Sequence, residues 1–189
     1  MYRHVAWILA IAMAALPGVV QAQTRDWYVA PTVGATTGGD TTSTGTLVGL
    51  AAGWMSSGLF SLDAELTHAP NFFEQDGFRT RRDLTTVMGH VNVAFGSADA
   101  IVRPFVTGGA GVLMPRLSEP GGFGAIDVTD VAYQVGVGML VGPRDRVGLR
   151  ADVRYVRAAG DSAHDANAFG LEVSRLRFWR VSTALVVGF

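Results

Sequence analysis

Eight segments of the chain, each about 10 to 14 residues long, alternate polar and apolar residues or consist of apolar and small residues. They run over Trp27–Thr36, Thr46–Met55, Leu59–Ala69, Leu84–Phe95, Ile101–Val112, Val131–Val141, Val147–Arg157 and Leu176–Phe189. A period of two is the side-chain repeat of a β-strand, because successive Cβ atoms point to opposite faces. The sequence therefore predicts an all-β chain.

The gaps between these segments alternate between short and long. The short gaps are Ser56–Gly58, Gly96–Ala100 and Gly142–Arg146, and the long, polar or Gly/Pro-rich gaps are Thr37–Gly45, Pro70–Asp83, Leu113–Asp130 and Ala158–Arg175. In an antiparallel sheet this order puts the short turns at one end and the long loops at the other. The segments also have the ~9–11 residues that a tilted strand needs to cross a membrane. We therefore predict an eight-stranded antiparallel up-and-down transmembrane β-barrel, with both termini in the periplasm.

The first 22 residues have the form of an export signal. Arg3 and His4 precede an apolar run from Val5 to Leu16, and Val20-Gln-Ala22 is a small-x-small cleavage site. We predict a signal peptide over residues 1–22 and a barrel domain over residues 23–189, located in the bacterial outer membrane. The net charge of −1 gives no electrostatic reason to expect nucleic-acid binding.

Aromatic residues fall at both ends of the predicted strands. Trp27, Trp54, Phe60, Phe95 and Phe189 lie near the short turns, and Tyr133, Tyr155 and Trp179 lie near the long loops. Two belts of rings are typical of a barrel that is held at a fixed depth in a bilayer. The alternative is that these rings only pack against the hairpins.

Charged residues recur on the face that the alternation directs inward. In Val147–Arg157, Arg150, Asp152 and Arg154 occupy every second position. The predicted interior charges are Asp63, Glu65, Arg103, Arg150, Asp152, Arg154 and Arg180. Side chains fill the interior of an eight-stranded barrel, and buried charges are tolerated when they are paired. We predict a structural salt-bridge network, with Gly109, Gly111, Gly136 and Gly138 making room for the arginines; the alternative is an ion path.

The chain resembles the small eight-stranded outer-membrane barrels of the OmpA/OmpX type, and more closely the stand-alone outer-membrane β-barrel domain proteins of Gram-negative bacteria. The segments that carry the resemblance are Val181–Phe189, Arg103–Gly111 and Asp145–Arg157. The resemblance implies that the last strand, ending at Phe189, is a signal for the barrel-assembly machinery. No peptidoglycan-binding domain follows that strand, so we do not expect cell-wall anchoring.

Catalytic and metal-binding patterns are weak. His164 lies in a long gap with Asp161, Ser162 and Asp165, a composition that fits a polar surface loop better than a catalytic triad. His90 is expected to be a hydrogen-bonded interior residue, and His68 carries no signal alone. Gly121–Gly124 lacks the Lys and Ser/Thr of a phosphate-binding loop. We predict no catalytic residue, metal site or cofactor.

The long gap Pro70–Asp83 combines aromatic and positively charged residues. These residues are Phe72, Phe73, Phe78, Arg79, Arg81 and Arg82. This composition suits lipid headgroups or a partner protein; alternatively, Phe72 and Phe73 cap the barrel and the arginines meet lipopolysaccharide phosphates. We expect a non-enzymatic outer-membrane protein that supports envelope integrity or surface interaction, with outer-membrane lipid and lipopolysaccharide as partners. The alternatives are a lipid A-modifying enzyme and a narrow ion channel.

Overall fold

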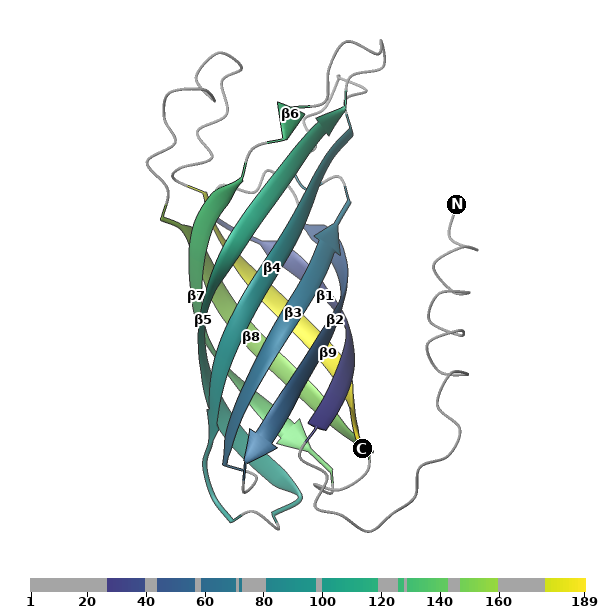
Figure 1. Cartoon of the computed structure of the whole chain (residues 1–189), viewed down its shortest axis with the longest axis vertical. Helices are drawn as coiled ribbons and strands as arrows, with labels where there is room; N and C mark the ends of the chain where they lie inside the picture. The colour runs from purple at the N-terminus through teal and green to yellow at the C-terminus, as the bar shows by residue number, and fades with distance from the viewer. Residues whose placement is uncertain are drawn as a thin grey trace, which may run out of the picture.

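The computed structural model describes residues 27–39, 44–56, 59–70, 72, 81–97, 100–118, 126–127, 129–142, 147–159 and 176–189. Within these residues the chain forms nine antiparallel strands (Figure 1). They are β1 (Trp27–Thr37), β2 (Gly45–Ser56), β3 (Phe60–Ala69), β4 (Arg81–Ala94), β5 (Val102–Ser118), β6 (Ile126–Asp127), β7 (Asp130–Val141), β8 (Val147–Ala158) and β9 (Arg177–Gly188). The predicted signal peptide and its cleavage site before Gln23 lie outside the described residues.

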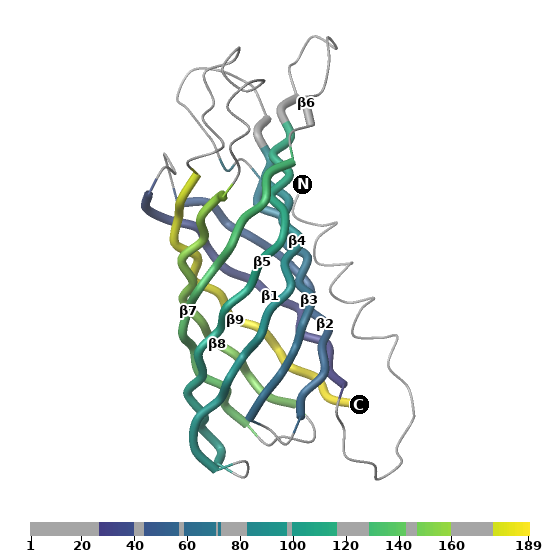
Figure 2. Tube along the Cα trace, turned by 60° about the vertical axis from the view of Figure 1, so that its left-hand side comes forward, coloured from purple at the N-terminus to yellow at the C-terminus, as the bar shows by residue number. Residues whose placement is uncertain are grey.

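Eight of these strands close into a barrel. Each pairs with its neighbours in the order β4-β3-β2-β1-β9-β8-β7-β5, and β4 pairs with β5 to complete the ring. The first and last strands lie side by side, and the Phe189 amide donates to the Trp27 carbonyl at 3.0 Å. Figure 2 shows the tilt of the strands around the wall. The predicted eight-stranded up-and-down barrel is confirmed. We call the end that carries the long gaps the loop end and the other the turn end.

The strands β4 and β5 extend beyond the predicted segments at the loop end. Residues 81–83 pair with residues 116–118, although both were predicted to lie in loops. The two-residue strand β6, also not predicted, pairs with β5 through Arg116 and Leu117. Pro115 and the polar residues interrupt the apolar alternation here, but main-chain pairing between two neighbouring strands does not require it. The hairpin therefore rises above the other strands (Figure 1).

The barrel has an apolar outside and a polar inside. Along β3 the burial alternates without exception: Leu62 and Leu66 are 45% and 52% exposed, whereas Asp63 and Glu65 are 6% and 2% exposed. The same phase holds in β4 and β9, as the alternation predicted. In water such an exterior would expose a large apolar area, whereas in lipid it is solvated and the closed ring satisfies the backbone.

The aromatic residues form two groups on the outer wall. Trp27, Phe60, Phe95 and Phe189 are exposed at the turn end, and Trp54 is half-buried beside them. At the loop end the rings of Tyr155 and Trp179 lie 5.2 Å apart, and Tyr133 is exposed nearby. Within the part of the chain that the structure describes, no helix is long and apolar enough to cross a membrane.

Candidate functional site: the barrel interior

An apolar layer fills the barrel at the loop end. Its members are Leu47, Ala69, Phe72, Leu84, Met88, Leu113, Ala132, Val156, Ala158, Leu176 and Phe178. Phe72 is only 1% exposed, and its ring meets that of Phe178 edge-on at a centroid distance of 4.9 Å. For Phe72, this packing favours the capping alternative over an exposed binding surface. This layer was not predicted from the sequence; its signal is the presence of apolar residues on both faces of the strand ends.

A charged layer lies next to the apolar layer, on its turn-end side, and spans the barrel. Glu65 accepts from Arg154 Nη1 at 2.9 Å and also from Arg180 Nη2. Asp152 lies 2.9 Å from Arg154 Nε and 3.2 Å from Arg150 Nε. Ser182 donates to the same carboxylate at 2.7 Å. Two acidic residues on β3 and β8 are thereby shared among three arginines on β8 and β9.

Asp63 is surrounded by donors. One oxygen, Oδ2, accepts from the Tyr28 hydroxyl at 2.6 Å, from Asn92 Nδ2 at 3.0 Å and from Arg150 Nη1 at 3.1 Å. His90 Nδ1 lies 2.7 Å from the second oxygen. Four side chains from three other strands therefore surround one buried carboxylate, which offsets the cost of removing its charge from water.

His90 connects this carboxylate to the rest of the layer. Its Nε2 lies 3.2 Å from Arg154 Nη1 and also contacts the amide nitrogen of Gln134. Because Arg154 can only donate, Nε2 acts as the acceptor and the proton lies on Nδ1, facing Asp63. His90 is the hydrogen-bonded interior residue that the sequence predicted, whereas the roles of Tyr28 and Gln134 were not anticipated.

Six of the seven predicted interior charges meet in this layer. Arg103 is buried too, at 3% exposure, but it lies on β5 opposite Leu140, nearer the turn end. The prediction for the four glycines is correct only for Gly136, where an added Cβ would come within 2.8 Å of Arg154 Cγ. Gly109, Gly111 and Gly138 instead make room for His90, Met88 and Phe105.

Two small cavities flank the charged layer. One, of about 20 Å³, lies between this layer and the apolar layer and is lined by Thr36, Thr67, Thr86, Gln134 and Arg180, among others. The other, of about 10 Å³, lies toward the turn end between Tyr28, Ser61, Asn92 and Arg150. Each has room for about one water molecule, and polar atoms without a protein partner, such as Gln134 Oε1 and Asn92 Oδ1, come from residues that line them.

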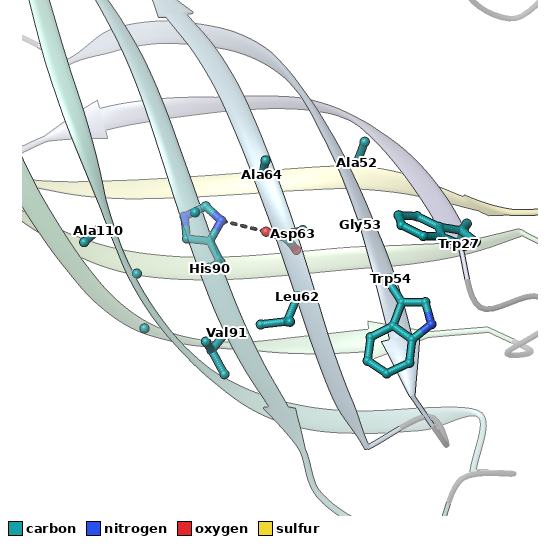
Figure 3. Close-up of a pocket in the computed structure, with 13 residues that line it drawn as sticks. Trp27, Ala52, Gly53, Trp54, Leu62, Asp63, Ala64, His90, Val91 and Ala110 are labelled. Atoms are coloured by element: carbon teal, nitrogen blue, oxygen red, sulfur yellow. Dashed lines mark hydrogen bonds and ion pairs between the residues drawn. The ribbon is translucent and has the colours of Figure 1, made fainter.

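The outer wall carries a wide, open hollow across β2 to β5 (Figure 3). Ala52, Ala64, Gly89 and Ala110 lie side by side in register at its floor, and Trp27 and Trp54 lie at its turn-end edge. Asp63 and His90 belong to the same stretch of wall but are bonded to each other and buried. The outward-facing side chains of the hollow are therefore carbon only, apart from the tryptophan nitrogens.

Outside the lumen, the described residues offer few candidate catalytic or metal-binding side chains. Among them, no group of three or more His, Cys, Asp or Glu side chains could hold a metal ion. On the exterior, His68 Nδ1 lies 3.1 Å from the Thr85 hydroxyl. Asp161, Ser162, His164 and Asp165 lie outside the described residues, as do Phe73, Phe78 and Arg79. Only the backbone of Arg81 and Arg82 is described.

Comparisons with known proteins agree with this architecture. Residues 6–176 match the family model described as outer membrane protein beta-barrel domain. Neisserial surface protein A has a similar structure, with a TM-score of 0.66 at 16% identity over 86% of this chain and 96% of that one. The attachment invasion locus protein Ail of Yersinia pestis gives a TM-score of 0.55 at 10% identity over 87% and 97% of the two chains.

The N-terminal β-barrel domain of OprF from Pseudomonas aeruginosa is similar as well. Its TM-score is 0.51 at 15% identity, with 88% of this chain and all 100% of that one covered. No curated protein sequence matches the chain. At these identities the structural matches establish the fold.

Proposed function

The chain belongs to the outer membrane protein β-barrel domain family and is a bacterial outer-membrane protein, and we propose that it is a non-enzymatic envelope protein whose lumen is closed by its own side chains. In this proposal the long loops face the outside of the cell and meet surface partners, and the termini lie in the periplasm. The barrel itself is the rigid support from which the loops emerge.

The observation that carries this proposal is the charged layer. Glu65 and Asp63 on β3 pair with Arg154 and Arg150 on β8, and all four side chains are at most 6% exposed. Ion pairs that satisfy one another across a narrow barrel occupy the space through which ions would pass. The apolar layer above them, capped by Phe72, adds a second barrier. The interior charges thus have a structural role in this proposal.

Conductance and stability of Asp152→Ala test the closed lumen. Asp152 contacts Arg150, Arg154 and Ser182, so its removal leaves buried cations with less compensation. We expect a lower melting temperature in detergent and no steady single-channel current in planar bilayers, for wild type and variant alike. Charge-selective currents that change in Asp152→Ala while the melting curve stays in place would favour the narrow-channel alternative.

The enzymatic alternative has its own test. Wild-type protein, refolded and incubated with lipid A, is expected to leave the lipid mass unchanged. A mass change that requires folded protein would replace the proposal with a lipid A-modifying activity.

We also propose that β9 and Phe189 are recognised by the barrel-assembly machinery. Phe189 is 57% exposed at the turn end, next to the seam where β9 meets β1. Phe189→Ala should reduce the amount of heat-modifiable protein in outer membranes while leaving refolding of the purified chain into detergent unchanged. Equal amounts in the membrane would remove Phe189 from this role.

A further inference from the structure

His90 of β4 lies in the charged layer with hydrogen-bond donors against its Nε2. Arg154 Nη1 is 3.2 Å from this nitrogen, and the amide nitrogen of Gln134 contacts it as well. A guanidinium and an amide NH2 only donate, so neither can accept a hydrogen bond from the ring. His90 therefore fits this site as a neutral imidazole, with its one proton on Nδ1 toward Asp63, 2.7 Å away.

The charges of the layer are balanced without a charge on His90. Three acidic residues and three arginines form its ion pairs, and all six side chains are at most 6% exposed. The pairs join Asp63 with Arg150, Glu65 with Arg154 and Arg180, and Asp152 with Arg150 and Arg154. A second proton on His90 would add a cation to this buried layer without a further acidic residue to pair with it, which is costly away from water.

The neighbours of His90 determine how that cation would be received. On β3, Asp63 and Glu65 lie 2.7 and 3.9 Å from Nδ1 and attract a positive charge, but both already bind an arginine. On β8, Arg154 repels it, and on β5 the register neighbour Gly109 is uncharged. The other ionisable groups of the layer bind these neighbours: Tyr28 and Arg150 at Asp63, Arg180 at Glu65, and Asp152 at Arg154.

Gln134 on β7 can respond to a second proton on the ring. Its Nε2 faces His90, whereas its Oε1 has no hydrogen-bond partner in the part of the chain that the structure describes. Half a rotation of the amide exchanges these two atoms and brings Oε1 to the ring, where it accepts from a protonated His90 Nε2. The amide nitrogen then faces the polar cavity of about 20 Å³ that Gln134 lines.

We propose that His90 makes the charged layer sensitive to acid. A proton from solvent binds His90 Nε2, the Gln134 amide turns, and Arg154 moves away from the ring, which weakens its ion pair with Glu65. The layer is firmly closed at neutral pH and loosened in acid. The inference uses the same layer as the proposed closed lumen, but it concerns the response of that layer to protons and holds whether or not ions pass.

The direction of the pH effect follows from the two states of the histidine. A histidine in the unfolded chain takes up a proton near pH 6.5, about the ordinary value, whereas the folded layer binds the neutral ring. Stability is therefore complete above about pH 7.5 and falls as the pH drops below about 6.5. Asp and Glu titrate near pH 4, so a comparison between about pH 7.5 and 5 reports on histidine.

Urea unfolding of the refolded full barrel in detergent over this pH range tests the proposal. The unfolding equilibrium constant of the wild type should rise by up to about tenfold for each pH unit below 6.5, the factor for uptake of one proton on unfolding. His90→Gln cannot take up that proton and should lose the rise, whereas Gln134→Leu, which has no oxygen to turn to the ring, should show a steeper one. His68→Gln is the matched control, because His68 is an exposed histidine on β3, and it should behave as the wild type.

Nuclear magnetic resonance provides a second measurement, which uses only the wild type. With 15N-labelled histidine and glutamine, His90 Nε2 should carry no proton at neutral pH, and the side-chain amide signals of Gln134 should shift as His90 titrates. Unchanged wild-type stability between about pH 7.5 and 5, an equal pH effect in His90→Gln, or a protonated His90 Nε2 at neutral pH would each overturn the proposal. Bilayer recordings at neutral pH test the closed lumen separately.

Discussion

Arg154 Nη1 on β8 lies 2.9 Å from Glu65 Oε2 on β3, and these two strands are four places apart in the ring of eight. The ion pair therefore joins opposite walls of the barrel. Asp63 and Arg150 make the same connection at 3.1 Å. The partners in these two ion pairs are 87 and 89 positions apart in the chain. The pairs thus hold opposite walls together and fix the cross-section of the barrel. The contacts that close the lumen are therefore also contacts that stabilise the fold of the wall.

Glu65→Gln should be among the most destabilising single changes in the lumen. The amide leaves Arg154 and Arg180 without their shared counter-charge, a loss of about 3–5 kcal/mol for buried pairs. Urea unfolding in detergent, followed by tryptophan fluorescence, measures it. In a double-mutant cycle with Arg154→Gln, the double variant should lose less than the sum of the singles; additive losses would mean that the two residues are not coupled.

Tyr28→Phe isolates one hydrogen bond. The hydroxyl donates to Asp63 at 2.6 Å, and hydrogen bonds to charged groups contribute about 1.5–3 kcal/mol. The phenyl ring keeps the packing against Ala30, Ala51 and Ala184. We expect a loss of that size in the free energy of unfolding, against a change below about 0.5 kcal/mol for Tyr155→Phe on the outer wall. A similar effect in both variants would argue against a special role of the Asp63 contact.

The fold could be predicted from the sequence because the inner and outer faces of the barrel wall differ strongly in polarity. Alternation assigned Asp63 and Glu65 to the inside and Leu62 and Leu66 to the outside, as observed. The predicted end of the segment Ile101–Val112 was wrong because the difference in polarity between the two faces ends there. Residues 113–118 lie beyond the apolar band, so no pattern marks them as a strand. Main-chain pairing with β4 extends there regardless of side-chain polarity.

The partners within the lumen could not be predicted in the same way. Alternation shows that a side chain points inward, but contacts across the lumen depend on register and tilt, which bring Asp63 to Arg150 and Glu65 to Arg154. Neutral polar residues such as Gln134 also look unremarkable beside charges. The same reason explains the error on the glycines: Gly138 lies opposite Asp152 in register, yet the nearest side chain to it is Phe105.

Gly136→Ala should destabilise the charged layer, because the new methyl group on the barrel wall would press against Arg154. An added methyl group would lie within 2.8 Å of Arg154 Cγ and close to the Val153 carbonyl, and overpacking of this kind costs about 1–3 kcal/mol. Gly108→Ala on the outer face is the control, because no atom lies within 4 Å of the added carbon. Thermal unfolding in the same detergent compares the two. If Gly136→Ala and Gly108→Ala had the same melting temperature, the barrel would have more free space around Arg154 than the structure indicates.

Two valines of β7 test the depth at which the barrel lies in the membrane. Val137 and Val131 are 59% and 58% exposed, but Val137 is four residues from Tyr133 toward the turn end, whereas Val131 lies beyond it toward the loops. Arginine on the lipid face costs about 2–4 kcal/mol at the midplane and about 0–1 kcal/mol near the interface. Val137→Arg should therefore lower the free energy of unfolding from lipid vesicles by the larger amount and Val131→Arg by the smaller one. Because both variants add the same side chain at equal exposure, their difference measures depth alone. Equal costs would mean that the ring of Tyr133 does not mark the membrane boundary.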